Sequence, residues 1–417
     1  MVGKCWGLLV FVLLGCKNSE QIFSEKNRDS DPDISNFSNF DFSSDSFELS
    51  KSFKSQTAVF ESIFFSSNKY QLSHPLKSDL LYGFFNDLRN SHYKQATKID
   101  YSFIRREYHT FTHAMDVFIT THCILQSGGK IYFTQDEQVA LLFAALGHDA
   151  LHTGVNNSFL METKHPYSKE SKKVSVQEER SADYMIKLFN KYGIFSIREE
   201  MKDIEKNNHS KIRKLVQQSI LWTDIKKHKR LMTEVSNIEK KVHQIINQKR
   251  TRVSNFKTEV ARKSDINESI NISGFLELEE RIILASFILH CADVSNPGKE
   301  WTLCERWAGL VMNEFFSQGD LEKKLGLKPS MNCDRDKVSV PACQIGFGDY
   351  VIRDLYKLLR NIVYDSGETL LNNFELNQKN WKELLKKEKN SGIAYQIKFE
   401  PPTKEGGWIG QFRENEK

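Results

Sequence analysis

Proline is absent from two long stretches of this sequence, between Pro75 and Pro166 and again from residue 167 to residue 296. Within these stretches apolar residues recur at the 3.6-residue spacing of an amphipathic helix. Because proline interrupts helices, its exclusion over such lengths favours helical structure. We therefore predict an all-α fold, a compact multi-helix bundle.

The segment 134–149 shows how one of these helices is encoded. Thr134 and Glu137 have the spacing of a capping box, which satisfies free backbone donors at a helix start. One buried face is predicted by apolar residues at i, i+3, i+4 and i+7, namely Val139, Leu142, Phe143 and Leu146. His148 and Asp149 follow this face, so the helix end is expected to place polar side chains at the wall of a cavity.

Composition excludes some functions and partners. The 417 residues include 59 basic and 54 acidic ones, and the net charge of +5 is close to balance, so no nucleic-acid partner is predicted. None of the seven cysteines lies in a CxxC spacing. Cys123 and Cys291 lie in apolar helical segments and are expected to be buried, reduced and unpaired. This favours a reducing, cytoplasmic location for the main domain.

The two ends of the chain differ from its middle. Residues 1–16, MVGKCWGLLVFVLLGC, resemble a signal or lipid-anchor segment that is too short to span a bilayer, although a stray hydrophobic start fits them as well. Membrane association is expected only through this segment. Residues 17–55, rich in Ser, Asp, Asn and Phe, predict a disordered leader. The main domain is expected over 56–400, followed by a tail at 401–417.

Four groups of metal-capable or acid–base residues lie along the helical part. They are His109 with His113, His148 with Asp149 and His152, Thr223 with Asp224, and His290 with Asp293. Each of the first two groups contains a histidine pair at i, i+4, which places both rings on one helix face. A buried carboxylate or imidazole at a helix end is costly unless it is paired or coordinated. Surface positions are expected for six further histidines, His74, His92, His165, His209, His228 and His243, whereas His122 is expected to be structural.

Two histidines and two aspartates suit Zn²⁺ or a similar divalent ion, with open positions left for water. A second, harder ion such as Mg²⁺ would accept an oxygen from a shared carboxylate. Two metals about 3.5–4 Å apart are the usual apparatus for phosphoester hydrolysis. The residue types therefore favour a metal-dependent phosphohydrolase.

The same segments resemble the catalytic domain of the class I cyclic nucleotide phosphodiesterases, within the wider HD-type phosphohydrolases. YHTFTHAMDV is similar to the family's YHNxxHAxDV, LGHDALHTGVNNSFL to HDxxHPGxxNxFL, and WTDIKKH to TDMxxH. HCADVSNPGKEW, NEFFSQGDLEKKLGL and CDRDKVSVPACQIGFGDY resemble the family's C-terminal half. The resemblance covers roughly residues 80–365. It implies hydrolysis of the 3′,5′-cyclic phosphodiester of cAMP or cGMP to the 5′-monophosphate.

The resemblance also implies the metal and catalytic residues. The first metal, expected to be Zn²⁺, would be bound by His113, His148, Asp149 and Asp293. Asp149 would bridge to the second metal, expected to be Mg²⁺ or Mn²⁺, and a hydroxide shared by both metals would attack the phosphorus. His109 would be the general acid that protonates the leaving 3′ oxygen. The waters around the second ion would be held by His152, Glu178 and Thr223.

The substrate pocket follows from the resemblance in the same way. Gln344 would bind the purine edge, with Phe347 stacking on one face of the base and Val311 covering the other. Tyr108 and Asn296 would line the pocket. Because a glutamine amide can rotate to suit adenine or guanine, the sequence does not choose between cAMP and cGMP. It gives no oligomeric state either.

Two departures from the family pattern leave other functions open. Thr110 stands where the family has Asn, and its Glu-Asn-His-His element reads Glu178-Glu179-Arg180-Ser181. Ser181 replaces a histidine that would help to hold second-metal waters, so weaker binding of that metal is expected. The alternatives are an HD-type phosphohydrolase acting on another nucleotide, and a weakly active or non-catalytic relative that binds cyclic nucleotides.

Overall fold

The computed structural model describes residues 40–64, 78–92, 106–170, 174–197, 199–256 and 271–395. Every regular element among these residues is helical, which confirms the expected fold class. No helix in this described part combines the length and the apolarity that a bilayer span requires. The expected anchor at 1–16 and tail at 401–417 lie outside the described residues.

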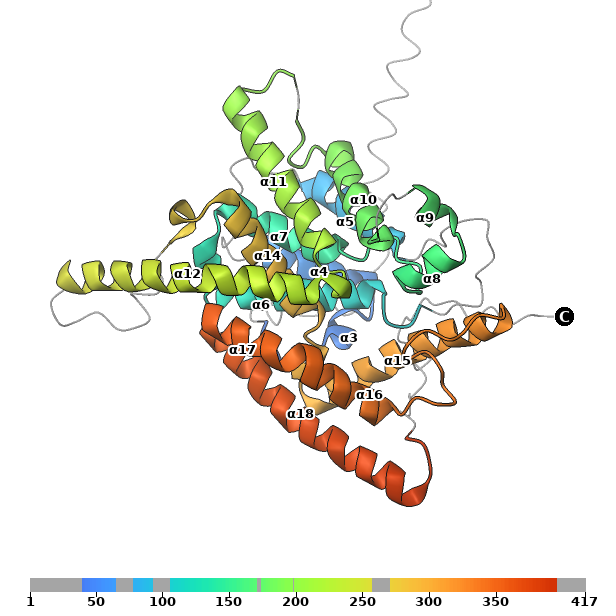
Figure 1. Cartoon of the computed structure of the whole chain (residues 1–417). Helices are drawn as coiled ribbons and strands as arrows, with labels where there is room; N and C mark the ends of the chain where they lie inside the picture. The colour runs from blue at the N-terminus through green and yellow to red at the C-terminus, as the bar shows by residue number, and fades with distance from the viewer. Residues whose placement is uncertain are drawn as a thin grey trace, which may run out of the picture. The chain divides into compact units, whose positions relative to one another are not determined.

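Four helices that contact one another form the centre of the domain (Figure 1). They are α6 (Phe111–Gln126), α7 (Gln135–Gly147), α11 (Asp203–Leu221) and α14 (Leu278–Asp293). Almost every residue of α6 and α7 is buried, because apolar residues dominate both helices; the polar side chains of α6, such as Asp116, are buried as well. The capping box at the start of α7 is present: the Thr134 hydroxyl accepts from the Glu137 N–H, and the Glu137 carboxylate accepts from the Thr134 N–H. The helix ends that carry the candidate ligands are therefore held in a packed core.

Further helices precede these four helices and lie between them in the chain. Those before α11 are α3 (Ser46–Leu49), α4 (Phe53–Phe64), α5 (Ser78–Ser91), η2 (Gly129–Tyr132), α8 (Asn157–Glu162), α9 (Pro166–Glu170) and α10 (Val176–Tyr192). The charged stretch after α11 contains η3 (Ile225–Lys227), α12 (His228–Phe256) and η4 (Ser273–Phe275). α12 packs on α14 through one apolar face, with Leu231, Val235, Ile238 and Val242 buried. Most of its other described side chains contact solvent, as the high charge of this stretch predicts.

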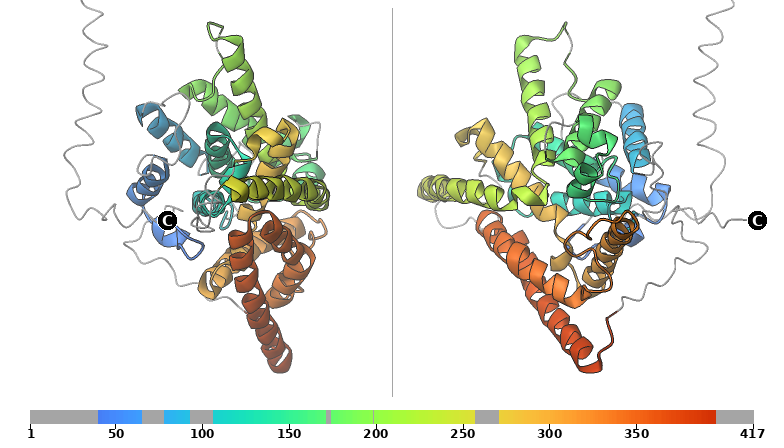
Figure 2. Two further views of the ribbon diagram at one scale, coloured as in Figure 1. Left: turned by 90° about the vertical axis from the view of Figure 1, so that its left-hand side faces the viewer. Right: turned by 45° about the vertical axis from the view of Figure 1, so that its right-hand side comes forward.

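The C-terminal helices form a second group beside the central helices. They are η5 (Asn296–Gly298), α15 (Trp301–Lys324), α16 (Val340–Phe347), η6 (Gly348–Ile352, a π-helical turn), α17 (Arg353–Ile362) and α18 (Tyr364–Ser391). α17 and α18 lie side by side, and α16 packs against α18, as the orange and red ribbons show in all views (Figures 1 and 2). This group brings α15 and α16 to the candidate site.

Three expectations about single positions are wrong. His92, His165 and His228 are buried rather than exposed. The ring of His92 packs on Phe111 and that of His165 on Tyr167, while Nδ1 of His228 lies 3.0 Å from Nε2 of His290. Burial lowers the pKa of all three imidazoles, which favours the neutral form. Cys123 and Cys291 are buried and unpaired, as expected.

The predicted disordered leader, 17–55, is wrong over its last residues. α3 and the start of α4 lie within it, and Phe47 is buried in contact with Trp307. The sequence of this part is poor in aliphatic residues, but its phenylalanines supply the apolar surface that packing requires. Residues 17–39 of the expected leader lie outside the described residues.

The close approach of α15 to the following loop depends on Gly319. A Cβ atom there would lie 1.8 Å from the carbonyl oxygen of Cys333, and a backbone group cannot rotate away as a side chain can. We expect Gly319→Ala to lower the free energy of unfolding by about 1–3 kcal/mol, measured by urea denaturation. Gly274→Ala is the control, because a Cβ there would meet nothing within 4 Å. Equal stability of the two variants would contradict the predicted overlap.

Candidate active site

Four side chains from three central helices converge at one point. His113 is on α6, His148 and Asp149 follow directly on α7, and Asp293 is the last residue of α14. Nε2 of His113 lies 3.1 Å from Oδ1 of Asp293 and 3.6 Å from Oδ2 of Asp149. Nε2 of His148 lies 3.3 and 3.1 Å from the same two oxygens. The two imidazoles and two carboxylates predicted to share a cation are thus within reach of one.

The orientation of these groups suits a divalent metal. His148 Nδ1 lies 2.8 Å from the carbonyl oxygen of Ala145, which fixes the ring and leaves Nε2 for a ligand. His148 Nε2 and Asp149 Oδ2 are buried, and although they lie 3.1 Å apart neither makes a hydrogen bond of favourable geometry. Such atoms are costly to bury unless something coordinates them. His113, His148 and Asp149 each offer a ligand atom within 4.8 Å of the others.

The charges of the site favour a cation as well. Burial raises the pKa of Asp149 and of Asp293, but the neighbouring imidazoles, His148 foremost, outweigh it and hold both pKa values well below their usual range. Conversely, burial lowers the pKa of His148, but the two carboxylates outweigh it and raise that pKa well above 6.5. Both carboxylates therefore stay anionic, and the site stabilises positive charge.

A second group of acidic side chains lies near Asp149. Burial, followed by the carboxylates of Asp224 and Asp149, raises the pKa of Glu178 to about 7. Asn157 Nδ2 donates to both Glu178 oxygens, and the Ser175 hydroxyl donates to Asp224. Buried carboxylates that repel one another could hold a second cation. The Thr223 hydroxyl donates to the carbonyl of Ile220, so it faces its own helix end.

The loop after α7 is held through its carbonyl groups by side chains that the family pattern does not contain. Ser181 Oγ donates to the Ala150 carbonyl, and Arg180 Nη1 to that of Leu151. Leu151 has a positive φ of 65°, a conformation uncommon for a branched side chain. Ser181 and Arg180 thus fasten this loop.

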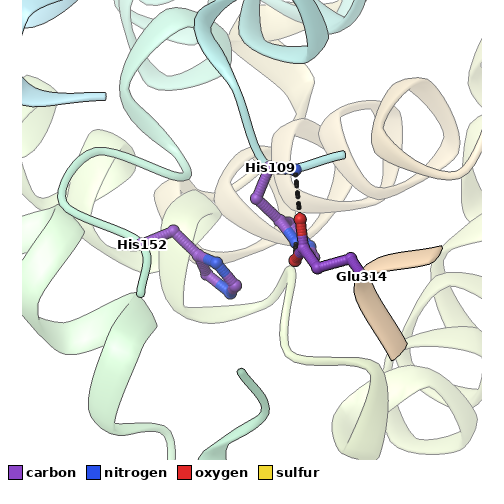
Figure 3. A group of neighbouring side chains, drawn as sticks. All are labelled: His109, His152 and Glu314. Carbon is purple, nitrogen blue, oxygen red and sulfur yellow. Dashed lines mark hydrogen bonds and ion pairs between the residues drawn. The ribbon is translucent and has the colours of Figure 1, made fainter. Parts of the chain in front are cut away.

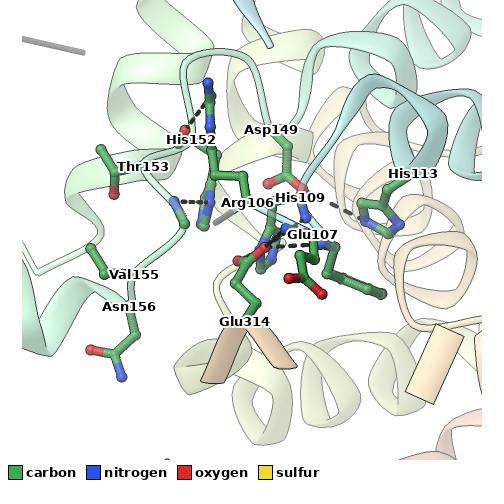
Figure 4. A network of polar contacts seen from close by, with 12 residues as sticks. Arg106, Glu107, His109, His113, Asp149, His152, Thr153, Val155, Asn156 and Glu314 are labelled. Atoms are coloured by element: carbon green, nitrogen blue, oxygen red, sulfur yellow. Dashed lines mark hydrogen bonds and ion pairs between the residues drawn. The ribbon is translucent and has the colours of Figure 1, made fainter. Parts of the chain in front are cut away.

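The other side of the loop is held around His152 (Figure 4). Arg106 Nη1 donates to the His152 carbonyl, and the amide nitrogen of Gln177 lies 2.8 Å from His152 Nε2. The side-chain oxygen of Gln177 accepts the backbone N–H and the hydroxyl of Thr153, and its side-chain nitrogen donates to the Val155 carbonyl. His152 is therefore turned toward Gln177, and its ring stacks on that of His109 at a centroid distance of 3.8 Å.

His109 is held by a residue for which sequence reasoning gave no role, Glu314 of α15 (Figure 3). His109 Nδ1 bonds to Oε1 of Glu314, and the second carboxylate oxygen accepts the backbone N–H groups of Glu107, Tyr108 and His109. Glu314 is 205 positions from His109 in the chain, and only its place in the segment NEFFSQGD could have drawn attention to it. This carboxylate fixes both the ring of His109 and the backbone that carries it.

The same contact sets the ionisation of His109. Burial lowers its pKa, but the carboxylates of Glu314, Asp149 and Asp293 outweigh burial and raise the pKa to about 9. Burial likewise raises the pKa of Glu314, but His109 outweighs it and lowers that pKa to about 2. At neutral pH His109 therefore carries a proton on each ring nitrogen, with Nδ1–H donated to Glu314.

The residues expected to line the pocket lie in the loop before α6 and on η5, α15 and α16. The Tyr108 hydroxyl donates to Asn296 Oδ1 at 2.6 Å, and Asn296 Nδ2 donates to Asp116 at 3.2 Å. Asp116 in turn forms a buried ion pair with Lys299, with 2.9 Å between Nζ and Oδ1. Neither Asp116 nor Lys299 was singled out by sequence reasoning, yet together they anchor Asn296.

The remaining pocket residues lie on α15 and α16. Val311 is half-buried, and Cys343 and Ile345 of α16 pack on the same apolar cluster as Val311 does. Gln344 and Phe347 are half-buried as well. The Gln344 carboxamide makes no hydrogen bond to another described residue, so it is available to a ligand.

Comparisons with known proteins match this chain to one family and one fold. A family model described as 3′5′-cyclic nucleotide phosphodiesterase matches residues 108–374. The probable 3′,5′-cyclic-AMP phosphodiesterase pde-4 of Caenorhabditis elegans is 27% identical over 281 residues, which cover 67% of this chain and 38% of that protein. A 3′,5′-cyclic-AMP phosphodiesterase, isoform F, of Drosophila melanogaster is 30% identical over 284 residues, with the same two shares. The chain thus spans less than two fifths of the length of these relatives.

A solved structure shares the fold. The phosphodiesterase domain of a RhoPDE fusion protein from the choanoflagellate Salpingoeca rosetta superposes with a TM-score of 0.65 at 21% identity. The match covers 86% of this chain and 100% of that domain. At this identity the likeness establishes the fold alone.

The contact between Glu314 and His109 predicts a shift in ionisation. In Glu314→Gln the attraction between carboxylate and imidazolium is lost while burial remains, so we expect the pKa of His109 to fall below about 9. The ring would then lose its proton at a lower pH, which NMR of its carbon-bound protons can follow. Glu300→Gln, an exposed change at the N-cap of α15, is the control. An unchanged titration of His109 in Glu314→Gln would contradict this assignment.

Proposed function

Because the chain belongs to the 3′,5′-cyclic nucleotide phosphodiesterase family, we propose that it hydrolyses a 3′,5′-cyclic nucleotide to the nucleoside 5′-monophosphate. The observation that carries the proposal is the convergence of His113, His148, Asp149 and Asp293 on one point. The names of the relatives from worm and fly support cAMP as a substrate. cGMP stays a candidate, since rotation of the Gln344 carboxamide exchanges its oxygen and nitrogen and so suits either adenine or guanine.

These four residues would hold the first cation, for which Zn²⁺ fits the donor set of imidazoles and carboxylates. Asp149 would share an oxygen with a second cation, Mg²⁺ or Mn²⁺, and Glu178 with its acidic neighbours supports that site. His152, Glu178 and Thr223 would act there through waters. When bound, the two ions would supply an activated water and neutralise charge on the phosphodiester.

His109 would be the proton donor. Hydrolysis forms a bond from a water oxygen to phosphorus and breaks the bond from phosphorus to O3′, so the departing O3′ must gain a proton. Glu314 holds Nδ1 of His109, which leaves Nε2–H to be given to O3′. After the transfer, His109 is neutral and recovers a proton from solvent. Against the effect of burial, the carboxylate of Glu314 raises the pKa of His109, which supports a charged donor when substrate binds.

The remaining residues would orient the nucleotide. Gln344 would hydrogen-bond the purine edge, Phe347 and Val311 would cover its two faces, and Tyr108 with Asn296 would bound the pocket. Flat apolar walls with few polar groups are typical of such pockets. The buried bonds from Tyr108 through Asn296 to Asp116 support fixed positions for this wall.

The rival function is that of a weakly active or non-catalytic relative, and it is favoured by one observation. The Ser181 hydroxyl donates to the Ala150 carbonyl. It therefore does not take over the role of the family's histidine, which would hold waters beside the second cation. An HD-type phosphohydrolase on another nucleotide is the second rival. Assaying wild-type protein with cAMP, cGMP and non-cyclic nucleotides separates these functions.

The roles assigned to His109 and Asp293 predict that substitution of each residue has a different effect on activity and on bound metal. His109→Ala is expected to lower kcat by about 10²–10⁴-fold because it removes the proton donor, with bound metal retained. Asp293→Ala is expected to lose both activity and first-site metal, measured by elemental analysis of the dialysed protein. His243→Ala, at an exposed position, is the control. Equal activity in all three variants would refute the assignment.

Metal dependence provides an independent prediction. Exhaustive chelation should abolish hydrolysis, and Zn²⁺ followed by Mg²⁺ or Mn²⁺ should restore it. Because Ser181 leaves the second site short of a ligand to its waters, we expect stimulation to need a high Mg²⁺ concentration, measured by steady-state kinetics across a metal titration. Full activity after chelation would exclude the proposed mechanism.

A further inference from the structure

The short helix α3 precedes the region of family similarity and has a fixed backbone. Oδ1 of Asp45 accepts the N–H groups of Phe47 at 2.8 Å and Glu48 at 3.2 Å, as an N-cap does. α3 also contacts α6, the helix of His113. Phe47 is buried, although the sequence around it is polar.

The ring of Phe47 packs on two consecutive residues of α15. It lies 4.4 Å from the ring of Trp307, centroid to centroid, and the Arg306 guanidinium carbon lies 3.7 Å from the Phe47 centroid. Aromatic and cation–π contacts stabilise a fold by more than the burial of apolar area alone would. Phe47 thus fills a specific place against α15.

Trp307 contacts both Phe47 and the pocket residue Tyr108. It is fully buried, and its ring lies 5.6 Å from that of Tyr108, with the planes nearly perpendicular. Phe47, Trp307 and Tyr108 belong to one apolar cluster, and Val311 packs against it. Tyr108 and Val311 are two of the residues that we place in the substrate pocket.

Packing in this cluster leaves little freedom. Protein interiors are close-packed, so removal of a buried ring leaves a void into which neighbours shift. Trp307 also touches His113, at 5.8 Å between ring centroids, but His113 is held independently by Asp293. Val311 is only half-buried and has fewer such restraints. The hydroxyl of Tyr108 is held by Asn296, so a void at Phe47 would displace the Val311 side of the pocket wall more than the metal ligands.

We propose that α3 is part of the substrate site: Phe47 is a positioning residue that fixes Trp307 and, through it, the wall formed by Tyr108 and Val311. The inference rests on the proposed function for the identity of this pocket. It also makes α3, which precedes the region of family similarity, part of the machinery that binds nucleotide.

Two variants of neighbouring phenylalanines test the proposal. Phe47→Ala is expected to raise KM for the cyclic nucleotide about tenfold, which corresponds to about 1.4 kcal/mol of lost binding free energy, with little change in kcat. Phe53→Ala is the matched control, because Phe53 is exposed and contacts Phe85 and Arg89 rather than this cluster. Phe47→Leu should recover most of the affinity, since it refills the void.

A binding measurement separates positioning from stability. In a His109→Ala background, calorimetry with cAMP should show a Kd weakened by the same factor in Phe47→Ala. If Phe47→Ala does not fold, Asp45→Ala, which removes only the cap, should still raise KM. A lower melting temperature with unchanged KM and Kd would overturn the inference. Absence of cyclic-nucleotide hydrolysis in wild type would instead refute the proposed function.

Discussion

Buried negative charge at helix ends is the constraint on which this structure depends. Asp149 and Asp293 stay ionised although their side chains are largely buried, with imidazoles as their near neighbours. Carboxylates are rarely buried without a counter-charge, so the helices that carry them must deliver ligands to one point. The apolar surfaces of α6 and α7 achieve this, because helices packed on all sides cannot rotate to move a ligand away.

The features that the sequence predicts are those written in local patterns. Helical periodicity and the capping box at Thr134 identify α7, and the residues directly after it are the ones that converge in space. Contacts over long separations have no such signature. Glu314 bonds to His109 across 205 positions, and Phe47 finds Trp307 from a segment whose composition suggests disorder. Burial of His92 and His228 was missed for the same reason.

The departures from the family pattern have a structural role in this chain. Where the pattern has two histidines, Arg180 and Ser181 bind the carbonyl groups of Leu151 and Ala150. Gln177 adds hydrogen bonds to Thr153 and Val155, so α10 secures the loop that presents His152. At the two positions where the family's histidines would hold waters, Arg180 and Ser181 instead fix the conformation of a loop. The stacking of His152 on His109 is the geometric result.

The ion pair between Lys299 and Asp116 has a consequence for how this protein can change over time. Both side chains are almost fully buried, and Asp116 also accepts from Asn296. Loss of either partner alone strands a charge in the interior, which is far more harmful than loss of both. The two sites, 183 positions apart, are therefore expected to covary among descendants of this sequence, and any lineage that exchanges them must find another anchor for Asn296.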